Sequence, residues 1–353
     1  MEKHGADIYT AAEKTGKNKE DIIDFSSNIN PLGIPESVKK ACVNSIGNSS
    51  KYPDINSREL IRSVAEQENV PEDWIFASNG AAEAIFRIPL FLKPKKGIVT
   101  APAFSEYESA LRVAECEVAY YNLREEEDFK IQDDILNCID SSTNIVFLCN
   151  PNNPTGQVTD FEITEKIIAK CKKFNAVAVI DECFLDFEEN KAEYSAVRLL
   201  GKYDNLIILK AFTKIYAIPG IRLGYCMCSN EQIIEGLKIS GPPWNVSNIA
   251  QAAGIAALQE KDYVRKTVEY INEQRKYLEE ELNRLNFKTY SSHANYILFK
   301  INNDLDLKNK MLEQGILIRS CSNYNNLDNS YYRVAVKTKE ENIHLIKALR
   351  KIF

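Results

Sequence analysis

Short apolar stretches rich in β-branched residues alternate with amphipathic stretches through the middle of the chain, and this alternation restricts the fold more than any other feature. The apolar stretches lie at 74–78, 97–102, 117–123, 144–151, 176–182 and 206–210. Amphipathic stretches separate several of them, at 79–92, 105–115 and 160–174. Strands that alternate with helices predict an α/β fold with a mainly parallel sheet and helices on both faces.

The pattern changes at about residue 262, where a long amphipathic helix with a charged outer face begins. After it come predicted strands at 295–301, 315–320 and 331–336, and a closing helix at 339–353. This order predicts a second, smaller α+β domain. We therefore expect an N-terminal arm that packs with the small domain, a large cofactor-binding domain and a small C-terminal domain, at 1–35, 36–261 and 262–353.

The balance of charges argues against nucleic acid or an anionic membrane as a partner. The chain carries 44 basic and 50 acidic residues, a net charge of −6, so it offers no electrostatic footprint for a polyanion. No apolar run reaches the roughly 18 residues that a membrane helix needs, and the first residues lack the apolar core of a signal peptide. The nine cysteines include no C-x-x-C pair, which favours reduced thiols in a cytoplasm and no metal site.

Two polar motifs follow predicted strands, at the edge where open α/β sheets bind their ligands. In the first, Gly80, Ala81 and Ala82 open a helix, and their small size lets its N-terminal N–H groups approach an anion. A glycine turn with a helix cap would explain this motif equally well. In the second, two prolines fix the loop 150–156 and present Asn153 on a rigid turn, which is a more specific signal.

Charged side chains follow the next two predicted strands. Asp181 closes the apolar stretch 176–180, where a carboxylate is costly unless a cation meets it. A helix cap, a salt bridge or a protonated ring nitrogen could provide the reason. Lys214 follows the stretch 206–209, and partial burial there would lower its pKa and favour the nucleophilic amine. Arg222, eight residues further on, can bind a phosphate through two parallel hydrogen bonds.

Together these motifs describe one site for pyridoxal 5′-phosphate. The glycine loop and Arg222 would cradle its phosphate, and Lys214 would form a Schiff base with its aldehyde. Asp181 would pair with the pyridine nitrogen, and Asn153 would bind the phenolic oxygen. With these residues, the chain resembles the fold-type I pyridoxal-phosphate enzymes of the aminotransferase class I/II group over nearly its whole length. The resemblance implies a large domain with a mainly parallel seven-stranded sheet.

The resemblance also implies roles for residues outside these motifs. Tyr52 would reach the cofactor phosphate of the other subunit of a homodimer, and Arg333 would grip the substrate carboxylate. Three positions depart from the pattern. Ala211 and Phe184 replace a serine and a tyrosine that often contact the cofactor, and Lys337, close to Arg333 in sequence, stands where relatives often have arginine. Thr213 would compensate for the missing serine at the phosphate site.

Motifs near both ends of the chain bear on the choice of reaction. The sequences "DFSSNINPLG" at 24–33 and "IRSCSNY" at 318–324 resemble threonine-phosphate decarboxylases of the cobalamin pathway more than the related histidinol-phosphate aminotransferases. The resemblance implies that His4, Asn30 and Arg319 surround a substrate phosphate. His4 could instead be a surface residue, and Arg319 could be an ion-pair partner.

Two residues of these motifs depart from the pattern of the decarboxylases. Ala6 and Asn326 stand where these relatives usually have glycine. Both departures count against the resemblance to the decarboxylases.

The expected reaction is decarboxylation of L-threonine O-3-phosphate to aminopropanol phosphate, or of serine phosphate or a phosphonate analogue. Arg333 and Asn153 would hold the carboxylate so that its bond to Cα is the one that breaks. Lys214 or a water would then return a proton to Cα. The substrates differ by a methyl group or a bridging oxygen, and a methyl group is worth only about 1–3 kcal/mol of discrimination.

Two rival functions remain open. An aminotransferase, for example one that acts on histidinol phosphate, would use the same residues, but Lys214 would remove the Cα proton. A non-catalytic regulator with this fold would carry a DNA-binding module ahead of it, and only about 25–30 residues precede the resemblance, too few for a helix-turn-helix domain and its linker.

Overall fold

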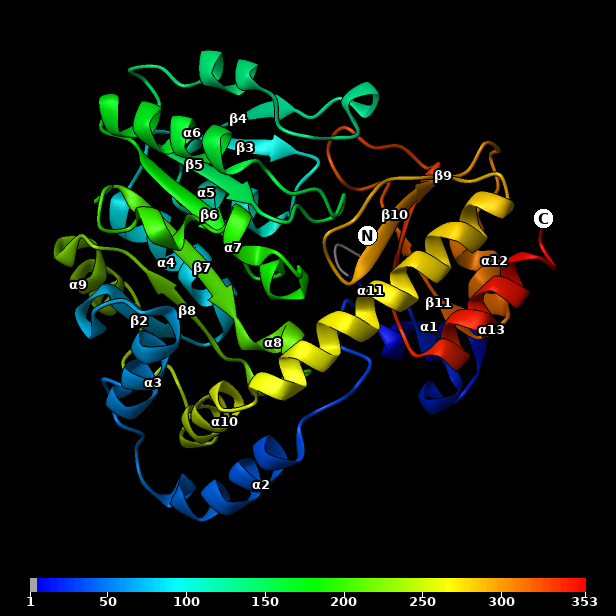
Figure 1. Cartoon of the computed structure of the whole chain (residues 1–353), viewed down its shortest axis with the longest axis horizontal. Helices are drawn as coiled ribbons and strands as arrows, with labels where there is room; N and C mark the ends of the chain where they lie inside the picture. Colours follow the sequence, from blue (N-terminus) through cyan, green and yellow to red (C-terminus); the bar gives the residue numbers. More distant parts are fainter. Residues whose placement is uncertain (1–4) are drawn as a thin grey trace.

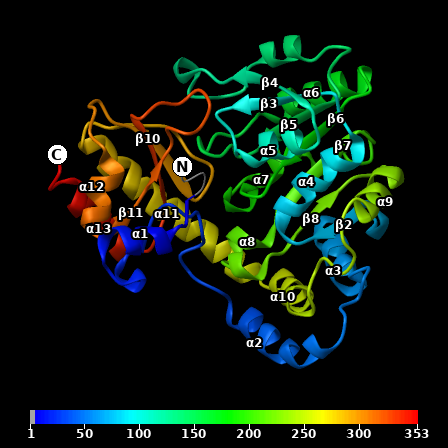
Figure 2. The same ribbon diagram turned by 180° about the vertical axis from the view of Figure 1, so that it is seen from behind.

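Two lobes joined by one long helix make up the molecule (Figure 1). The computed structural model describes residues 5–353. The larger lobe is built around a sheet from the middle of the chain, and Figure 2 shows from behind that both ends of the chain lie with the smaller lobe. Helix α11 (Lys261–Arg284) leads from the larger lobe to the smaller one. It begins next to the predicted boundary at residue 262, and the domain limits stay a prediction.

The larger lobe contains a seven-stranded sheet with the strand order β2-β8-β7-β6-β5-β3-β4. Only β8 runs antiparallel to its neighbours in this sheet. The mainly parallel seven-stranded sheet that we predicted is therefore confirmed. Its strands are β2 (Ile75–Ser78), β3 (Lys96–Ala101), β4 (Glu117–Asn122), β5 (Ile145–Cys149), β6 (Val177–Asp181), β7 (Leu206–Ala211) and β8 (Gly224–Met227).

Helices cover both faces of this sheet, which explains why its central strands are apolar without interruption. Along β7, Ile207 and Leu209 pack in one core and Ile208 in the other. The helices of the first core are α4 (Gly80–Leu92), α5 (Glu106–Val113) and α9 (Glu231–Ile239). Those of the second core are α3 (Arg58–Glu68), α6 (Phe161–Lys173) and α10 (Asn248–Leu258).

The smaller lobe has a four-stranded sheet in the order β12-β13-β10-β9 and a two-stranded sheet of β1 and β11. Its strands are β1 (Ile23–Asp24), β9 (Lys288–Thr289), β10 (Tyr296–Lys300), β11 (Ile316–Leu317), β12 (Arg319–Ser320) and β13 (Tyr331–Ala335). Its helices are α1 (Ile8–Thr15), α12 (Leu307–Glu313) and α13 (Lys339–Leu349). Because β1 pairs in parallel with β11, the N-terminal segment packs with this lobe.

The single strand predicted at 315–320 is two strands in the structure. Its first half, β11, pairs with β1, and its second half, β12, pairs antiparallel with β13. Ile318 lies at the change of partner and is fully buried. The change of sheet at this residue turns Arg319 toward the larger lobe, where it lines a cavity.

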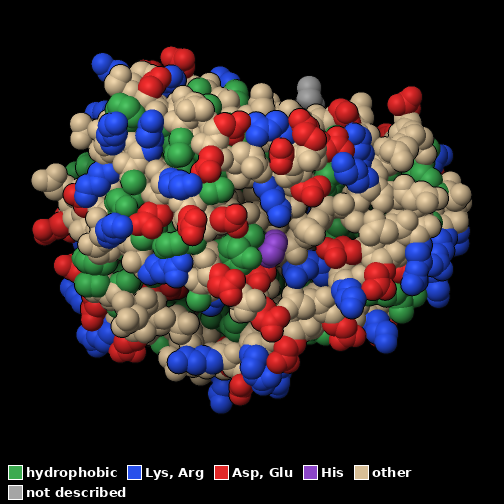
Figure 3. All heavy atoms as spheres, turned by 45° about the horizontal axis from the view of Figure 1, so that its top comes forward, with side chains coloured by type: hydrophobic (Ala, Val, Ile, Leu, Met, Phe, Trp, Pro, Cys, Tyr) green, Lys and Arg blue, Asp and Glu red, His purple; other side chains and the backbone are tan. Residues whose placement is uncertain are grey.

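Three further helices complete the fold, α2 (Glu36–Ser45), α7 (Lys191–Tyr194) and α8 (Phe212–Ile215). Within residues 5–353, no helix combines the length and the apolar character needed to cross a membrane. Basic and acidic side chains are mixed on the face of the molecule that Figure 3 shows.

A buried group of charges holds the ends of two central strands. The ammonium group of Lys210 on β7 lies 3.3 Å from Oε2 of Glu68 and 3.5 Å from Oε2 of Glu182, the residue after β6. The hydroxyl of Tyr225 donates to Oε1 of Glu68 at 2.6 Å. Buried charges of this kind must keep their partners, because removal of one leaves another uncompensated. The group therefore fixes β6 and β7 close to where Asp181 and Lys214 lie.

Candidate active site

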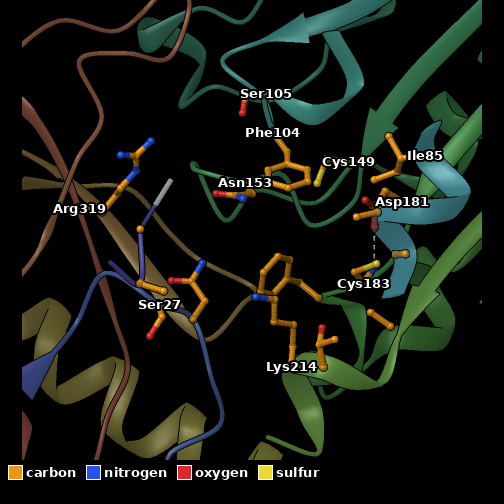
Figure 4. Close-up of a pocket in the computed structure, with 18 of the residues that line it drawn as sticks. Ser27, Ile85, Phe104, Ser105, Cys149, Asn153, Asp181, Cys183, Lys214 and Arg319 are labelled. Carbon is orange, nitrogen blue, oxygen red and sulfur yellow. Dashed lines mark hydrogen bonds between the residues drawn. The ribbon is translucent and has the colours of Figure 1, made fainter. Parts of the chain in front are cut away.

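A cavity of about 240 Å³ opens at the carboxyl ends of the parallel strands, between the two lobes. In Figure 4, Arg319 lies on one side of this cavity, and Asp181 and Cys183 lie on the other. Asn153 and Lys214 lie between these sides. The cavity is therefore at the edge of the sheet where the polar motifs were predicted to meet.

The first turn of α4 and Arg222 form a positively charged cradle. Gly80 has a φ of 72°, and a Cβ atom at this position would lie 2.7 Å from Nη2 of Arg222. Ala81 and Ala82 follow in the first turn of the helix and line the cavity beside Arg222. A helix N-terminus and a guanidinium group are both positive, so an anion between them stabilises the arrangement.

Asp181 is a buried carboxylate with ordered donors. The hydroxyl of Tyr107 donates to Oδ2 at 2.7 Å, and the backbone N–H of Cys183 donates to Oδ1 at 2.9 Å. Burial raises the pKa of the Asp181 carboxyl, and hydrogen bonds from Cys183 and Tyr107 oppose this rise. A protonated ring nitrogen would provide the cation that such a carboxylate needs.

Lys214 lies in α8, just after β7; it is partly buried and lines the cavity. Burial, together with the positive charges of Arg333 and Arg222, lowers the pKa of Lys214 to about 8. Cys183 and Asp181 act in the opposite direction. A large fraction of the amine is therefore neutral near pH 8, which is the form that acts as a nucleophile.

These groups fit pyridoxal 5′-phosphate part by part. The cradle at Gly80 suits its phosphate, Asp181 suits its pyridine nitrogen, and the amine of Lys214 suits its aldehyde. Thr213, which lines the cavity next to Lys214, is placed to add a hydroxyl donor. Of the residues that we predicted from the sequence for this cofactor, all but Gly80 and Tyr52 line one cavity, and Gly80 lies beside the guanidinium of Arg222.

Arg333 and Asn153 meet where the two lobes join. Nη1 of Arg333 donates to Oδ1 of Asn153, and Nη2 donates to the carbonyl of Ser26 at 2.8 Å. Arg333 is only 5% exposed, and its Nε has no hydrogen-bond partner among the described residues. This fixed and buried cation at the cavity is suited to bind a carboxylate.

Arg319 lies directly opposite Arg333, because their Cα atoms are partners in the β12–β13 pair. Arg319 is also buried and lines the cavity. Its Nη2 donates to Oδ1 of Asn323 at 2.8 Å, and its guanidinium lies 5.4 Å from the centre of the Tyr324 ring. Like charges at opposite positions of a strand pair are unfavourable, so anionic ligands would stabilise this arrangement.

Asn30 lies elsewhere, and our expectation that it contacts a substrate phosphate is corrected. Its Nδ2 donates to the carbonyl of Ile215 at 2.7 Å. It also donates to the hydroxyls of Tyr263 and Thr267, both at 2.8 Å. The backbone N–H of Asn30 donates to the carbonyl of Lys214 at 3.3 Å. All donors of this side chain are used within the protein, so Asn30 anchors the segment of Lys214 to α11.

Two other predicted contacts, those of Tyr52 and His4, stay predictions. Tyr52 does not line the cavity; it is 78% exposed, and its ring lies 4.6 Å from that of Trp244. His4 lies outside the described residues, so its contact with a substrate phosphate stays a prediction. Gly5 and Ala6, which follow it, line the cavity.

Sequence reasoning missed Tyr107 and Tyr324. Tyr107 resembles any apolar position of an amphipathic helix, but it lies in the first turn after β3, at the same sheet edge as the other motifs. Its place just after a predicted strand was the signal that could have identified Tyr107 as a site residue. Tyr324 donates to Oδ1 of Asn153 at 3.3 Å from a loop of the other lobe, and no local pattern announces such a contact.

The departures from the family pattern are accommodated without an added polar group. The ring of Phe184 lies 5.6 Å from the amine of Lys214 and packs edge-on against Tyr296. Ala6 has a φ of 70°, a conformation that favours glycine, and its N–H donates to Oγ of Ser26 at 2.7 Å. This hydrogen bond explains how an alanine is held there.

Comparisons with known proteins show what the whole chain is similar to. The chain is 36% identical to threonine-phosphate decarboxylase from Salmonella typhimurium, over 99% of this chain and 96% of that protein. The structure of histidinol-phosphate aminotransferase from Clostridium acetobutylicum is 32% identical, with a TM-score of 0.87 over 93% of this chain and 98% of that chain. A histidinol-phosphate aminotransferase from Sinorhizobium meliloti, solved in complex with pyridoxal-5′-phosphate, is 19% identical, with a TM-score of 0.85 over 98% and 95% of the two chains.

The family model for aminotransferase class I and II matches residues 20–349, almost the whole chain. This match confirms the predicted fold and the predicted cofactor, because the family depends on pyridoxal 5′-phosphate. The chain therefore belongs to the aminotransferase class I and II family.

Proposed function

We propose that this enzyme decarboxylates a small phosphorylated amino acid, with L-threonine O-3-phosphate as the first candidate and serine phosphate or a phosphonate analogue as alternatives. The observation that carries the proposal is the pair of buried arginines, Arg319 and Arg333, on paired strands at the cavity of Lys214. A substrate with a carboxylate and a phosphate would give each arginine its own anion. The 36% identity to a threonine-phosphate decarboxylase supports this choice.

The charges around the cavity suit such a substrate. Its charged lining residues are four cations and one carboxylate, namely Lys214, Arg222, Arg319, Arg333 and Asp181. The cofactor phosphate would be bound by Arg222 and the first turn of α4. The arginines of the smaller lobe are then left for the two anionic groups of the substrate. Inside a cavity, each such match is worth more than it would be in water.

The residues of the chain divide the chemical work. When bound, pyridoxal phosphate supplies an electron sink for the pair left by the bond broken at the substrate Cα. Asp181, held by Tyr107, would pair with the ring nitrogen of the cofactor. Arg333 and Asn153 orient the substrate carboxylate, and this orientation decides which bond at Cα breaks. Lys214 is placed to return a proton to Cα after carbon dioxide has left.

An aminotransferase acting on histidinol phosphate is the second candidate function. The 32% identity to the Clostridium acetobutylicum enzyme favours it. In that reaction the carboxylate grip would hold a different group, and the amine of Lys214 would take a proton from Cα instead of returning one.

Product analysis separates the two functions. We expect the purified holoenzyme, given O-phospho-L-threonine alone, to release carbon dioxide and aminopropanol phosphate in equal amounts. Histidinol phosphate with 2-oxoglutarate serves as the parallel assay, in which an aminotransferase makes one glutamate per turnover. Stoichiometric glutamate without carbon dioxide from any phospho-amino acid would refute the decarboxylase.

The lowered pKa of Lys214 predicts a pH dependence for cofactor attachment. Because only the neutral amine reacts, attachment to the apo-protein should rise about tenfold per pH unit at lower pH and level off above a pH of about 8. Borohydride reduction and peptide mapping would follow the adduct at Lys214. The free-amine control is Nα-acetyl-lysine, whose side-chain amine has a pKa of about 10.4. If the rate of cofactor attachment to the protein keeps rising with pH above about 8, as the rate for the control does, the pKa of Lys214 is not lowered by burial.

The two arginines of the smaller lobe should have separable roles. Arg319→Ala should cost about 2–4 kcal/mol in binding of a phosphorylated substrate, because it leaves anionic oxygens poorly paired. Arg333→Ala should weaken phosphorylated and non-phosphorylated carboxylate ligands alike. Inhibition constants for O-phospho-L-threonine and L-threonine would be compared, with Arg265→Ala, at an exposed ion pair with Glu269, as the control. Equal weakening of both ligands by Arg319→Ala would remove its assignment to the phosphate.

We also infer that the enzyme is a homodimer in which Tyr52 contributes to the partner's cofactor site. Tyr52 is too exposed to serve its own cavity, and apolar side chains nearby in sequence, Val43, Ile46 and Ile55, are exposed as well. Sedimentation equilibrium should therefore give twice the chain mass of 40.1 kDa. Tyr52→Phe should loosen the cofactor without dissociating the dimer. A fully active monomer would rule the inference out.

A further inference from the structure

The loop between β12 and β13, residues 321–330, reaches from the smaller lobe toward the larger one (Figure 1). Nδ2 of Asn325 donates to Oε2 of Glu108 on α5 at 3.2 Å. Leu327 packs against a core cluster that contains residues of both lobes. Tyr324 and Arg319 line the cavity at the base of this loop. The loop thus joins the lobes at the point where two proposed substrate groups lie.

Asn326 makes the most specific contact between this loop and the larger lobe. Its Nδ2 donates to the carbonyl of Ala101 at 3.1 Å and to the carbonyl of Leu123 at 2.7 Å. Ala101 is the last residue of β3, Leu123 follows β4, and both are buried. One amide group therefore binds the ends of two neighbouring strands.

Tyr324 links this contact to the arginines. Its carbonyl accepts a hydrogen bond from the N–H of Leu327 at 3.2 Å, which closes a tight turn containing Asn326. Its ring lies under the guanidinium of Arg319, 5.4 Å from ring centre to Cζ. Its hydroxyl accepts from Nη1 of Arg333 at 3.4 Å. The position of the turn thus determines where the ring and hydroxyl of Tyr324 lie between the two cations.

We propose that Asn326 is a positioning residue for the substrate. By tying the turn 324–327 to the strand ends of the larger lobe, its amide holds Tyr324 in place and thereby sets the spacing of the anion sites at Arg319 and Arg333. This inference rests on the proposed function for the identity of the anions. It deepens that function by assigning the residue that fits the site to a substrate with two anionic groups a fixed distance apart.

A turn requirement alone would also place asparagine here. The φ of Asn326 is 70°, at the third position of the turn, where glycine and asparagine are both favoured. Glycine meets this backbone requirement and removes only the amide group. Asn326→Gly therefore separates positioning of the substrate from geometry of the turn.

The experiment compares holoenzymes of the wild type, Asn326→Gly and Asn326→Asp. We expect Asn326→Gly to raise KM for the phosphorylated substrate about five- to tenfold, with kcat changed less than about twofold, because the sites are used in ground state and transition state alike. Asn326→Asp should raise KM further, since it places a carboxylate against two carbonyls. The affinity for pyridoxal phosphate should stay the same in both variants.

Asn329→Gly is the matched control, because Asn326 and Asn329 are both exposed in the same loop and, within the described residues, only the Asn326 amide donates to Ala101 and Leu123. It should leave KM at the wild-type value. If Asn326→Gly also keeps the wild-type KM, asparagine serves the turn alone and the inference is overturned. A rise in KM that Asn329→Gly shares equally would overturn it too, because the loop would then respond to glycine as such.

Hydrogen exchange provides a readout that does not depend on the reaction. Amides of residues 321–328 should exchange faster in Asn326→Gly than in the wild type or in Asn329→Gly, with and without substrate. Unchanged exchange would refute the tie to the larger lobe, whichever substrate the enzyme takes. If the wild type binds no phospho-amino acid but Asn326→Gly still exchanges faster than the wild type, the proposed function is wrong and the contact of Asn326 with the larger lobe is supported.

Discussion

The buried guanidinium of Arg333 is the interaction on which the rest of the site depends. A charge that is removed from water must be surrounded by acceptors, and Arg333 takes them from the loop of Asn153 in the larger lobe and from the carbonyl of Ser26 near the N-terminus. Three segments far apart in sequence are thereby held around one cavity. The same charge helps to lower the pKa of Lys214, so the group that joins the lobes also prepares the reactive amine.

The fold could be predicted because each helix and strand has a recognisable hydrophobic pattern in its own residues. Strands buried on both faces are apolar throughout, and the stretch that became β7 is a good example. The prediction of one strand at 315–320 was wrong. An apolar run does not indicate which strand it pairs with, and the chain passes from one sheet to the other at Ile318. Pairing with the N-terminal β1 is a contact across nearly the whole chain, and no pattern within a few residues can specify it.

For the site, prediction succeeded where a residue directly follows a strand, as Asp181 and Lys214 do, since the topology itself brings strand ends together. It failed where the partner comes from another lobe or from within a helix. Tyr107 and Tyr324 are such cases. Asn30 was misplaced for a related reason. A polar residue in a motif near the substrate can serve the scaffold, and only its three acceptors show that it does.

Through Asn30, the smaller lobe is connected to the peptide of Lys214. Helix α11 has 24 residues and at 1.5 Å per residue is about 36 Å long, so one continuous helix connects the two lobes. Its far end is bound to the smaller lobe through Glu281 and Arg350, and near its origin Tyr263 and Thr267 hold Asn30, which holds the peptide of Lys214. The position of the smaller lobe and the orientation of the amine are thus connected through one helix and a short series of hydrogen bonds.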